Sequence, residues 1–119
     1  MTLEHIVSSQ KDIISGIAIA CPGEINSKCG FIFKGGLIPY LTAIPLGSRL
    51  TKTFQLPVKV INDADAAALA EARYGSLQDL DCGAALVLGT GVGLGLVSQK
   101  DLLSSLSVTQ YLRVPSPKV

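Results

Sequence analysis

The chain has 119 residues with a net charge of +1; 48% of them are hydrophobic and only 16% are charged. This length fits one domain at most, and the absence of both a basic excess and any Trp argues against nucleic-acid binding. The longest apolar run, residues 82–97, is too short for a membrane-spanning helix and is interrupted by glycines. The three cysteines have no zinc-ligand spacing and no signal peptide precedes them, which together predict a cytoplasmic protein without a membrane partner.

The first half of the chain predicts a helix, a strand, a loop and a second helix. Apolar residues at helical spacing predict the first helix over residues 2–11. The unbroken apolar run at 17–20, which ends in Pro22-Gly23, is typical of a buried parallel strand. Residues 24–38 have the composition of a loop, with a short extended piece at 31–33, and the second helix is expected to begin near Pro45.

The second half continues the alternation of strands and helices. Residues 56–61 predict a strand, and the Ala-rich segment after it predicts a helix that ends at Tyr74, before Gly75. Another strand is expected at 84–88, whereas residues 102–119 predict no clear element. Strands alternating with helices are typical of an α/β fold.

A run of alternating glycines follows the strand at 84–88. Gly89, Gly91, Gly93 and Gly95 match neither the dinucleotide-binding fingerprint nor the Walker A motif. Bare backbone amides beside Thr90 could approach an anion closely, or the run could form a tight β-hairpin in a crowded sheet. The run alone does not separate these two interpretations.

Asn62 and Asp63 lie between the strand at 56–61 and the Ala-rich helix. A carboxylate at the end of a parallel strand lies where α/β proteins bind ligands, and it could accept the proton of an attacking hydroxyl group. Asn and Asp are also favoured helix caps, and the two roles are compatible. Gly35-Gly36 has a similar pair of interpretations, as a backbone edge that contacts a sugar or as an ordinary turn.

Taken together, these segments resemble the ROK family of sugar kinases and related repressors. The resemblance extends from about residue 14 to residue 99. It rests on three segments in the right order and spacing: Gly16–Gly23, Leu56–Glu71 and Leu88–Gly95.

The resemblance implies a fold and a set of site residues. The fold would be a fragment of a ribonuclease-H-like (actin/hexokinase-type) α/β domain, with a mixed sheet and flanking helices. Residues 1–99 would form part of the N-terminal domain, and residues 100–119 a tail that departs from the family. The implied roles are as follows: Asp63 as general base and sugar contact; Asn62, Gly35 and Gly36 as further sugar contacts; Gly89, Thr90 and Gly91 facing the phosphates of ATP, which carries Mg²⁺.

Three hypotheses about function remain open at this point. The parent protein is an ATP-dependent kinase of a hexose or amino sugar, or a sugar-responsive repressor, or the chain by itself is a non-catalytic remnant. The remnant hypothesis rests on motifs that the chain lacks, namely the family's Asp-x-Gly-Gly-Thr and Glu-x-Gly-His segments and its cysteine-rich zinc motif. Without the neighbouring strands, we expect an exposed sheet edge and apolar helix face to promote homo-oligomers or aggregation.

Overall fold

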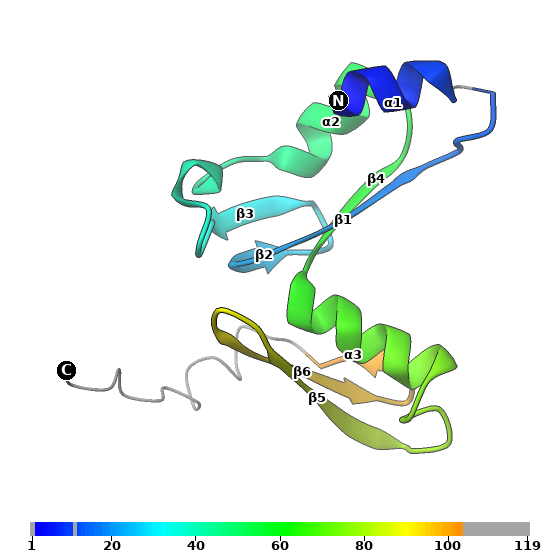
Figure 1. Cartoon of the computed structure of the whole chain (residues 1–119), viewed down its shortest axis with the longest axis vertical. Coiled ribbons are helices and arrows are strands. Elements are labelled where there is room, and N and C mark those ends of the chain that lie inside the picture. The colour runs from blue at the N-terminus through cyan, green and yellow to red at the C-terminus, as the bar shows by residue number, and fades with distance from the viewer. Residues whose placement is uncertain (1, 11, 104–119) are drawn as a thin grey trace. The chain divides into compact units, whose positions relative to one another are not determined.

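The computed structural model describes residues 2–10 and 12–103, which form a mixed α/β arrangement (Figure 1). The chain divides into two compact units, Met1–Asp63 and Ala64–Val119. Position 11 of the predicted first helix and most of the predicted tail, residues 104–119, lie outside the described residues. No helix in the described part of the chain is long and apolar enough to cross a bilayer.

The first unit is built on two parallel strands. β1 (Ile17–Cys21) pairs with β4 (Val58–Asn62), with Ile19 opposite Val60 and Cys21 opposite Asn62. Parallel pairing of these two apolar runs confirms the strands predicted at 17–20 and 56–61. Both strands therefore end at the same edge.

A short hairpin follows β1, where the sequence predicted mostly loop. β2 (Glu24–Asn26) and β3 (Phe31–Lys34) are antiparallel, so the loop prediction was wrong for β2 and correct in placing an extended piece at β3. Three residues are too few to show a strand period against the turn signals around them. Ile25 and Ile32 lie opposite each other in the hairpin and are both buried.

The remaining elements of the first unit are helical. α1 (Leu3–Ser9) lies near the N-terminus, and a 3-10 turn, η1 (Pro39–Leu41), follows the hairpin. α2 (Leu46–Phe54) begins directly after Pro45, as predicted. The buried core of this unit joins the parallel strands to the hairpin and consists of Cys21, Ile25, Ile32, Val58 and Val60.

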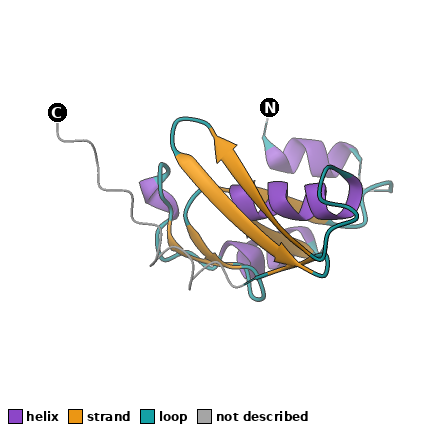
Figure 2. Ribbon diagram, turned by 90° about the horizontal axis from the view of Figure 1, so that it is seen from below, coloured by secondary structure: helices purple, strands orange, loops and turns teal. Residues whose placement is uncertain are grey.

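The second unit packs a helix on an antiparallel sheet. α3 (Asp63–Tyr74) begins at the last residue of the first unit, and β5 (Cys82–Leu88), β6 (Val92–Ser98) and β7 (Asp101–Leu102) follow it. β5 and β6 form the long hairpin that Figure 2 shows as two adjacent arrows. The sequence predicted no element over residues 102–119; within the part of that segment that the structure describes, Leu102 is the second residue of β7.

The two faces of the β5–β6 hairpin differ. One face packs against α3, where Ala68, Ala72 and Val97 form a buried cluster. The other face remains open: Leu86 is 62% exposed, Leu88 75% and Val92 70%. Exposed apolar faces favour association, but self-association of this chain stays a prediction.

Candidate functional site

Asn62 ties the end of β4 to the turn that follows β1. Its side-chain Nδ2 donates a hydrogen bond to the carbonyl oxygen of Gly23 at 2.9 Å. Asn62 is also the register partner of Cys21, the last residue of β1. Because the strands are parallel, the amide lies at the carboxyl edge of the pair, which is where α/β sheets bind ligands.

The turn at Gly23 packs directly on the turn at Gly35-Gly36. Gly23 has a φ of +109°, and a Cβ built there would collide with the carbonyl oxygen of Lys34. A Cβ at Gly36 would lie 3.2 Å from the backbone nitrogen of Gly23. The fold thus gathers Asn62, Gly35 and Gly36 around Gly23, which the sequence had not marked as a site residue, although a Pro-Gly pair directly after a strand signals such a turn.

The two glycines of the Gly35-Gly36 pair differ in what they can offer a ligand. Gly35 is buried, and its N–H donates to Thr42 Oγ1 at 3.1 Å. Its carbonyl oxygen accepts from the N–H of Ile38 at 2.9 Å. Gly36 is exposed with a φ of +58°, so Gly36 is the member of the pair whose backbone a ligand can approach.

Asp63 is exposed at the first position of α3, and its charge acts on Cys21. Cys21 is 6% exposed, and burial raises the pKa of its thiol above the ordinary value of 9.0. The negative charge of Asp63 raises that pKa further. The carboxylate therefore lies near the end of β1, at the same carboxyl edge as Asn62.

The tip of the β5–β6 hairpin contains Gly89, Thr90 and Gly91, all exposed. The N–H of Gly89 donates to the carbonyl oxygen of Gly91 at 2.9 Å. A Cβ at Gly91 would meet nothing within 4 Å, and one at Gly89 would meet only Gly91 O at 4.0 Å. Neither glycine has a positive φ, so neither packing nor backbone conformation requires glycine here. The bare turn leaves room for an anion such as a phosphate chain to reach the backbone.

The next two glycines of the run serve packing instead. A Cβ at Gly93 would lie 2.7 Å from the Cβ of Ala64, and one at Gly95 would lie 2.6 Å from the Cβ of Ala68. These glycines let α3 approach the sheet closely. The run is therefore a β-hairpin in a crowded sheet, as one interpretation held, and the phosphate-binding interpretation concerns only its tip.

Comparison with known proteins decides the family. A protein-family model described as the ROK family matches residues 1–107. The chain belongs to the ROK family. The resemblance inferred from residues 14–99 is thereby confirmed, while the predicted division at residue 99 stays a prediction.

Curated relatives of this chain include beta-glucoside kinases, a glucokinase and N-acetyl-D-glucosamine kinases. The chain is 41% identical over 90 residues to a beta-glucoside kinase of Listeria monocytogenes, a match that covers 76% of this chain and 31% of the relative. It is 38% identical over 95 residues to a glucokinase of Halalkalibacterium halodurans, covering 80% of this chain and 28% of that protein. The chain thus spans about a third of the length of the curated relatives it matches.

Solved structures similar to this chain show the same partial coverage. The Lmo2764 protein of Listeria monocytogenes superposes with a TM-score of 0.78 at 38% identity, over 85% of this chain and 34% of that one. A Streptomyces griseus ROK glucokinase in complex with glucose and AMPPNP superposes with a TM-score of 0.69 at 28% identity, over 86% of this chain and 35% of that one. A ROK transcriptional regulator, a homologue of E. coli MLC, superposes with a TM-score of 0.74 at 30% identity, over 87% of this chain and 26% of that one. These likenesses confirm the predicted fold class, a fragment of an actin/hexokinase-type α/β domain.

Proposed function

We propose that this chain carries the sugar-binding and base-bearing segment of an ATP-dependent ROK sugar kinase. The observation that carries the proposal is that Asn62 and Gly36 both contact the Gly23 turn at the carboxyl edge of β1 and β4, where Asp63 directly follows Asn62 and acts on Cys21. This edge joins a carboxylate, an oriented amide and an exposed backbone segment. A sugar hydroxyl needs such groups to be bound and deprotonated.

Each group has a distinct part in the proposed reaction. Asp63 would accept the proton of the attacking hydroxyl, because it is an exposed carboxylate at this edge. Asn62 would contact neighbouring hydroxyls from an orientation that the hydrogen bond to Gly23 maintains. The backbone at Gly35-Gly36 would line the sugar, chiefly through the exposed Gly36.

The tip of the β5–β6 hairpin is proposed to face the phosphates of ATP. Gly89, Thr90 and Gly91 fit that role because the turn carries a hydroxyl and no obstructing Cβ. ATP would supply the transferred phosphoryl group, with Mg²⁺ neutralising its developing charge. We further propose a cytoplasmic location, and a hexose such as glucose or a β-glucoside as substrate, since beta-glucoside kinases and a glucokinase are among the relatives.

Exchange of segments tests the catalytic part of the proposal. The matched 90 residues of the Listeria monocytogenes beta-glucoside kinase would be replaced by those of this chain, and ATP-dependent phosphorylation of cellobiose and glucose would be measured. We expect an active chimera. Changing Asp63→Asn in it should lower kcat by about 10²-fold or more with a small change in KM, since a general base acts on the chemical step. An inactive but folded chimera, or an Asp63→Asn chimera with full kcat, would contradict the proposal.

Sugar binding tests the first unit directly. Titration of the ¹⁵N-labelled chain with glucose should shift the backbone amides of Gly23, Gly35, Gly36 and Asn62. Asn62→Ala should weaken the binding about tenfold or more, which corresponds to the loss of one good hydrogen bond in a site. Asn26→Ala is the matched control, because Asn26 caps the hairpin turn at the other end of β2. Equal binding by both variants would refute the site.

A sugar-sensing segment of a ROK repressor is the second candidate. The likeness to the transcriptional regulator, with a TM-score of 0.74, favours it. Both candidates predict sugar binding, so binding alone does not distinguish them. The chimera does, because a segment that only senses sugar would bind glucose without restoring phosphorylation.

A further inference from the structure

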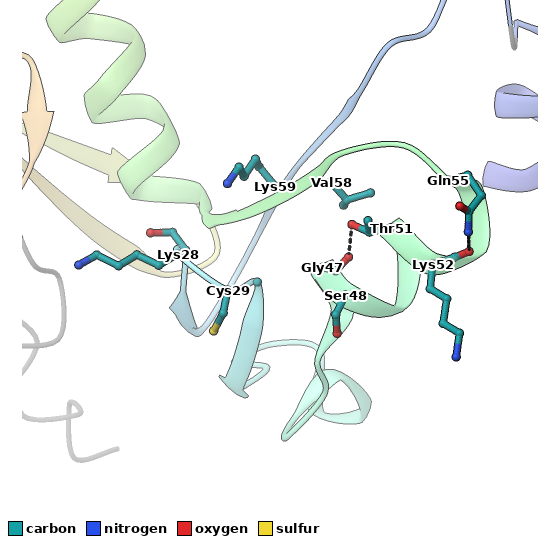
Figure 3. A pocket seen from close by; sticks show the side chains of 11 residues that line it. Lys28, Cys29, Gly47, Ser48, Thr51, Lys52, Gln55, Val58 and Lys59 are labelled. Carbon is teal, nitrogen blue, oxygen red and sulfur yellow. Dashed lines mark hydrogen bonds between the residues drawn. The ribbon is translucent and has the colours of Figure 1, made fainter.

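A surface cavity of about 500 Å³, open to solvent and lined mostly by exposed residues, lies in the first unit, away from the residues assigned to the sugar (Figure 3). The turn between β2 and β3, the length of α2 and the start of β4 form its walls. It shares no residue with the proposed sugar site. Lys59 in its wall and Asn62 at the sugar site are three strand residues apart, a separation of about 10 Å.

The lining of this cavity is basic. It contains Lys28, Lys52 and Lys59 and no carboxylate. The chain as a whole is nearly balanced, with 10 Lys and Arg against 9 Asp and Glu, so this local excess is not a reflection of composition. Two ion pairs occur among the described residues, Lys34 with Glu24 and Arg73 with Asp101, and neither involves the three lysines. Lysines without counter-ions along one cavity raise the local potential and attract an anion.

The hydroxyl groups in the wall are arranged as acceptors. Thr51 Oγ1 donates its proton to the carbonyl oxygen of Gly47 at 2.8 Å, which Figure 3 marks with a dashed line. Ser48 Oγ donates to the carbonyl oxygen of Pro45 at 3.1 Å. A hydroxyl whose proton is engaged still has oxygen lone pairs. Ser48 and Thr51 can therefore accept hydrogen bonds from hydroxyl groups of a ligand.

The wall is held in place by backbone contact between the hairpin turn and α2. The N–H of Gly47 donates to the carbonyl oxygen of Gly30 at 3.0 Å. A Cβ at Gly30 would lie 2.7 Å from the Cα of Gly47, so the two segments meet at the closest approach that glycine allows. A wall fixed in this way needs little ordering when a ligand binds.

We propose that this cavity binds a phosphate ester of a polyhydroxyl compound, with a sugar phosphate as the simplest case. Figure 3 shows the side chains of Lys28 and Lys59 extending away from α2, and that of Lys52 leaving α2 in another direction. All three side chains are exposed, and a long, flexible lysine side chain can turn toward a bound anion. Lys28 and Lys59 bind the phosphate group, and Ser48 and Thr51 accept from the hydroxyls. A cavity of this volume is large enough for a small phosphorylated sugar.

Titration of the ¹⁵N-labelled full chain at low salt tests the proposal, with glucose 6-phosphate, inorganic phosphate and glucose as separate probes. Glucose 6-phosphate should shift the amide resonances of residues 27–30 and 47–52. Added salt should weaken its binding, because salt screens the lysine charges. Lys28→Gln with Lys59→Gln should weaken binding about tenfold or more. Lys34→Gln is the matched control, because Lys34 lies at the other end of the hairpin and pairs with Glu24; it should change affinity less than about twofold.

A second variant tests the hydroxyl contacts. Ser48→Ala should weaken the binding of glucose 6-phosphate and leave the binding of inorganic phosphate unchanged. Equal affinity for the two phosphate probes would overturn the sugar-phosphate assignment. If the shifts were confined to Gly23, Gly36 and Asn62, the ligand would bind at the proposed sugar site, and the proposal that the cavity binds a sugar phosphate would be overturned. Glucose binding at Asn62 reports on the proposed function alone, so the two proposals can fail independently.

Discussion

Two glycine turns were expected to line a ligand, and they differ in why they contain glycine. In the first unit, Gly23 and Gly35 are required by the fold, because a Cβ at either would strike a backbone carbonyl oxygen. In the second unit, a Cβ at Gly89 or Gly91 would meet little or nothing. Packing therefore requires glycine in the first turn, whereas no feature of the structure requires it in the second.

This difference changes what each glycine says about function. At Gly23 and Gly35 the fold alone explains the residue, so glycine there is no evidence for a ligand; the case for a sugar rests on Asn62, Asp63 and Gly36 instead. At Gly89 and Gly91 the fold offers no explanation, which supports a ligand that needs access to bare backbone. Substitutions can break or sharpen this comparison.

Gly23→Ala should have the largest effect on stability. The backbone has a φ of +109° and the new Cβ would collide with Lys34 O, so we expect a loss of about 3 kcal/mol or more. Urea unfolding followed by circular dichroism measures it. Gly91→Ala is the control and should stay within about 0.5 kcal/mol of the parent chain. Similar losses in both variants would remove the distinction between the two turns.

Gly95→Ala tests the same distinction inside one run. Its Cβ would lie 2.6 Å from the Cβ of Ala68, so α3 must move away from the sheet. Overpacking of this kind should cost about 2 kcal/mol in the free energy of unfolding. Gly89→Ala, six residues earlier, should leave the unfolding midpoint unchanged. A Gly95→Ala chain as stable as Gly89→Ala would show that the packing contact is not needed.

Asn62→Ala should have a smaller effect on stability than either glycine substitution. It removes the 2.9 Å hydrogen bond to Gly23, which should lower the free energy of unfolding by about 1 kcal/mol. Amide hydrogen exchange around Gly23 should also become faster. Unchanged exchange at this turn would mean that Asn62 does not hold it.

The smallest effect is expected in the dependence of stability on pH. The folded-state pKa of Cys21 lies above the ordinary 9.0, because of burial first and the Asp63 charge second. The unfolded chain therefore loses this proton first, and the free energy of unfolding should fall as pH rises above about 9. Measured at about pH 8 and pH 10, the urea midpoint should fall less in Asp63→Asn than in the parent chain. If Asp63→Asn and the parent chain lost the same stability between these pH values, the proximity of Asp63 to Cys21 would be contradicted.

Local patterns predicted much of the fold and of the candidate site. The apolar runs of β1 and β4, Pro45 before α2 and the Ala-rich α3 were readable because each signal lies within a few neighbouring residues. β2 was missed, since three residues cannot establish a period. Gly23 was missed as part of the site because its contacts with Asn62 and Gly36 join residues that are far apart in the chain.

By itself, the sequence determined the family and the order of α1, β1, α2, β4, α3 and β5, because these depend on short motifs and on their spacing. Only the tertiary structure decided that β1 and β4 are parallel neighbours, that Gly93 and Gly95 serve packing, and that three lysines share one cavity. Those facts depend on which distant residues approach each other within a few ångströms. No local pattern encodes such distances.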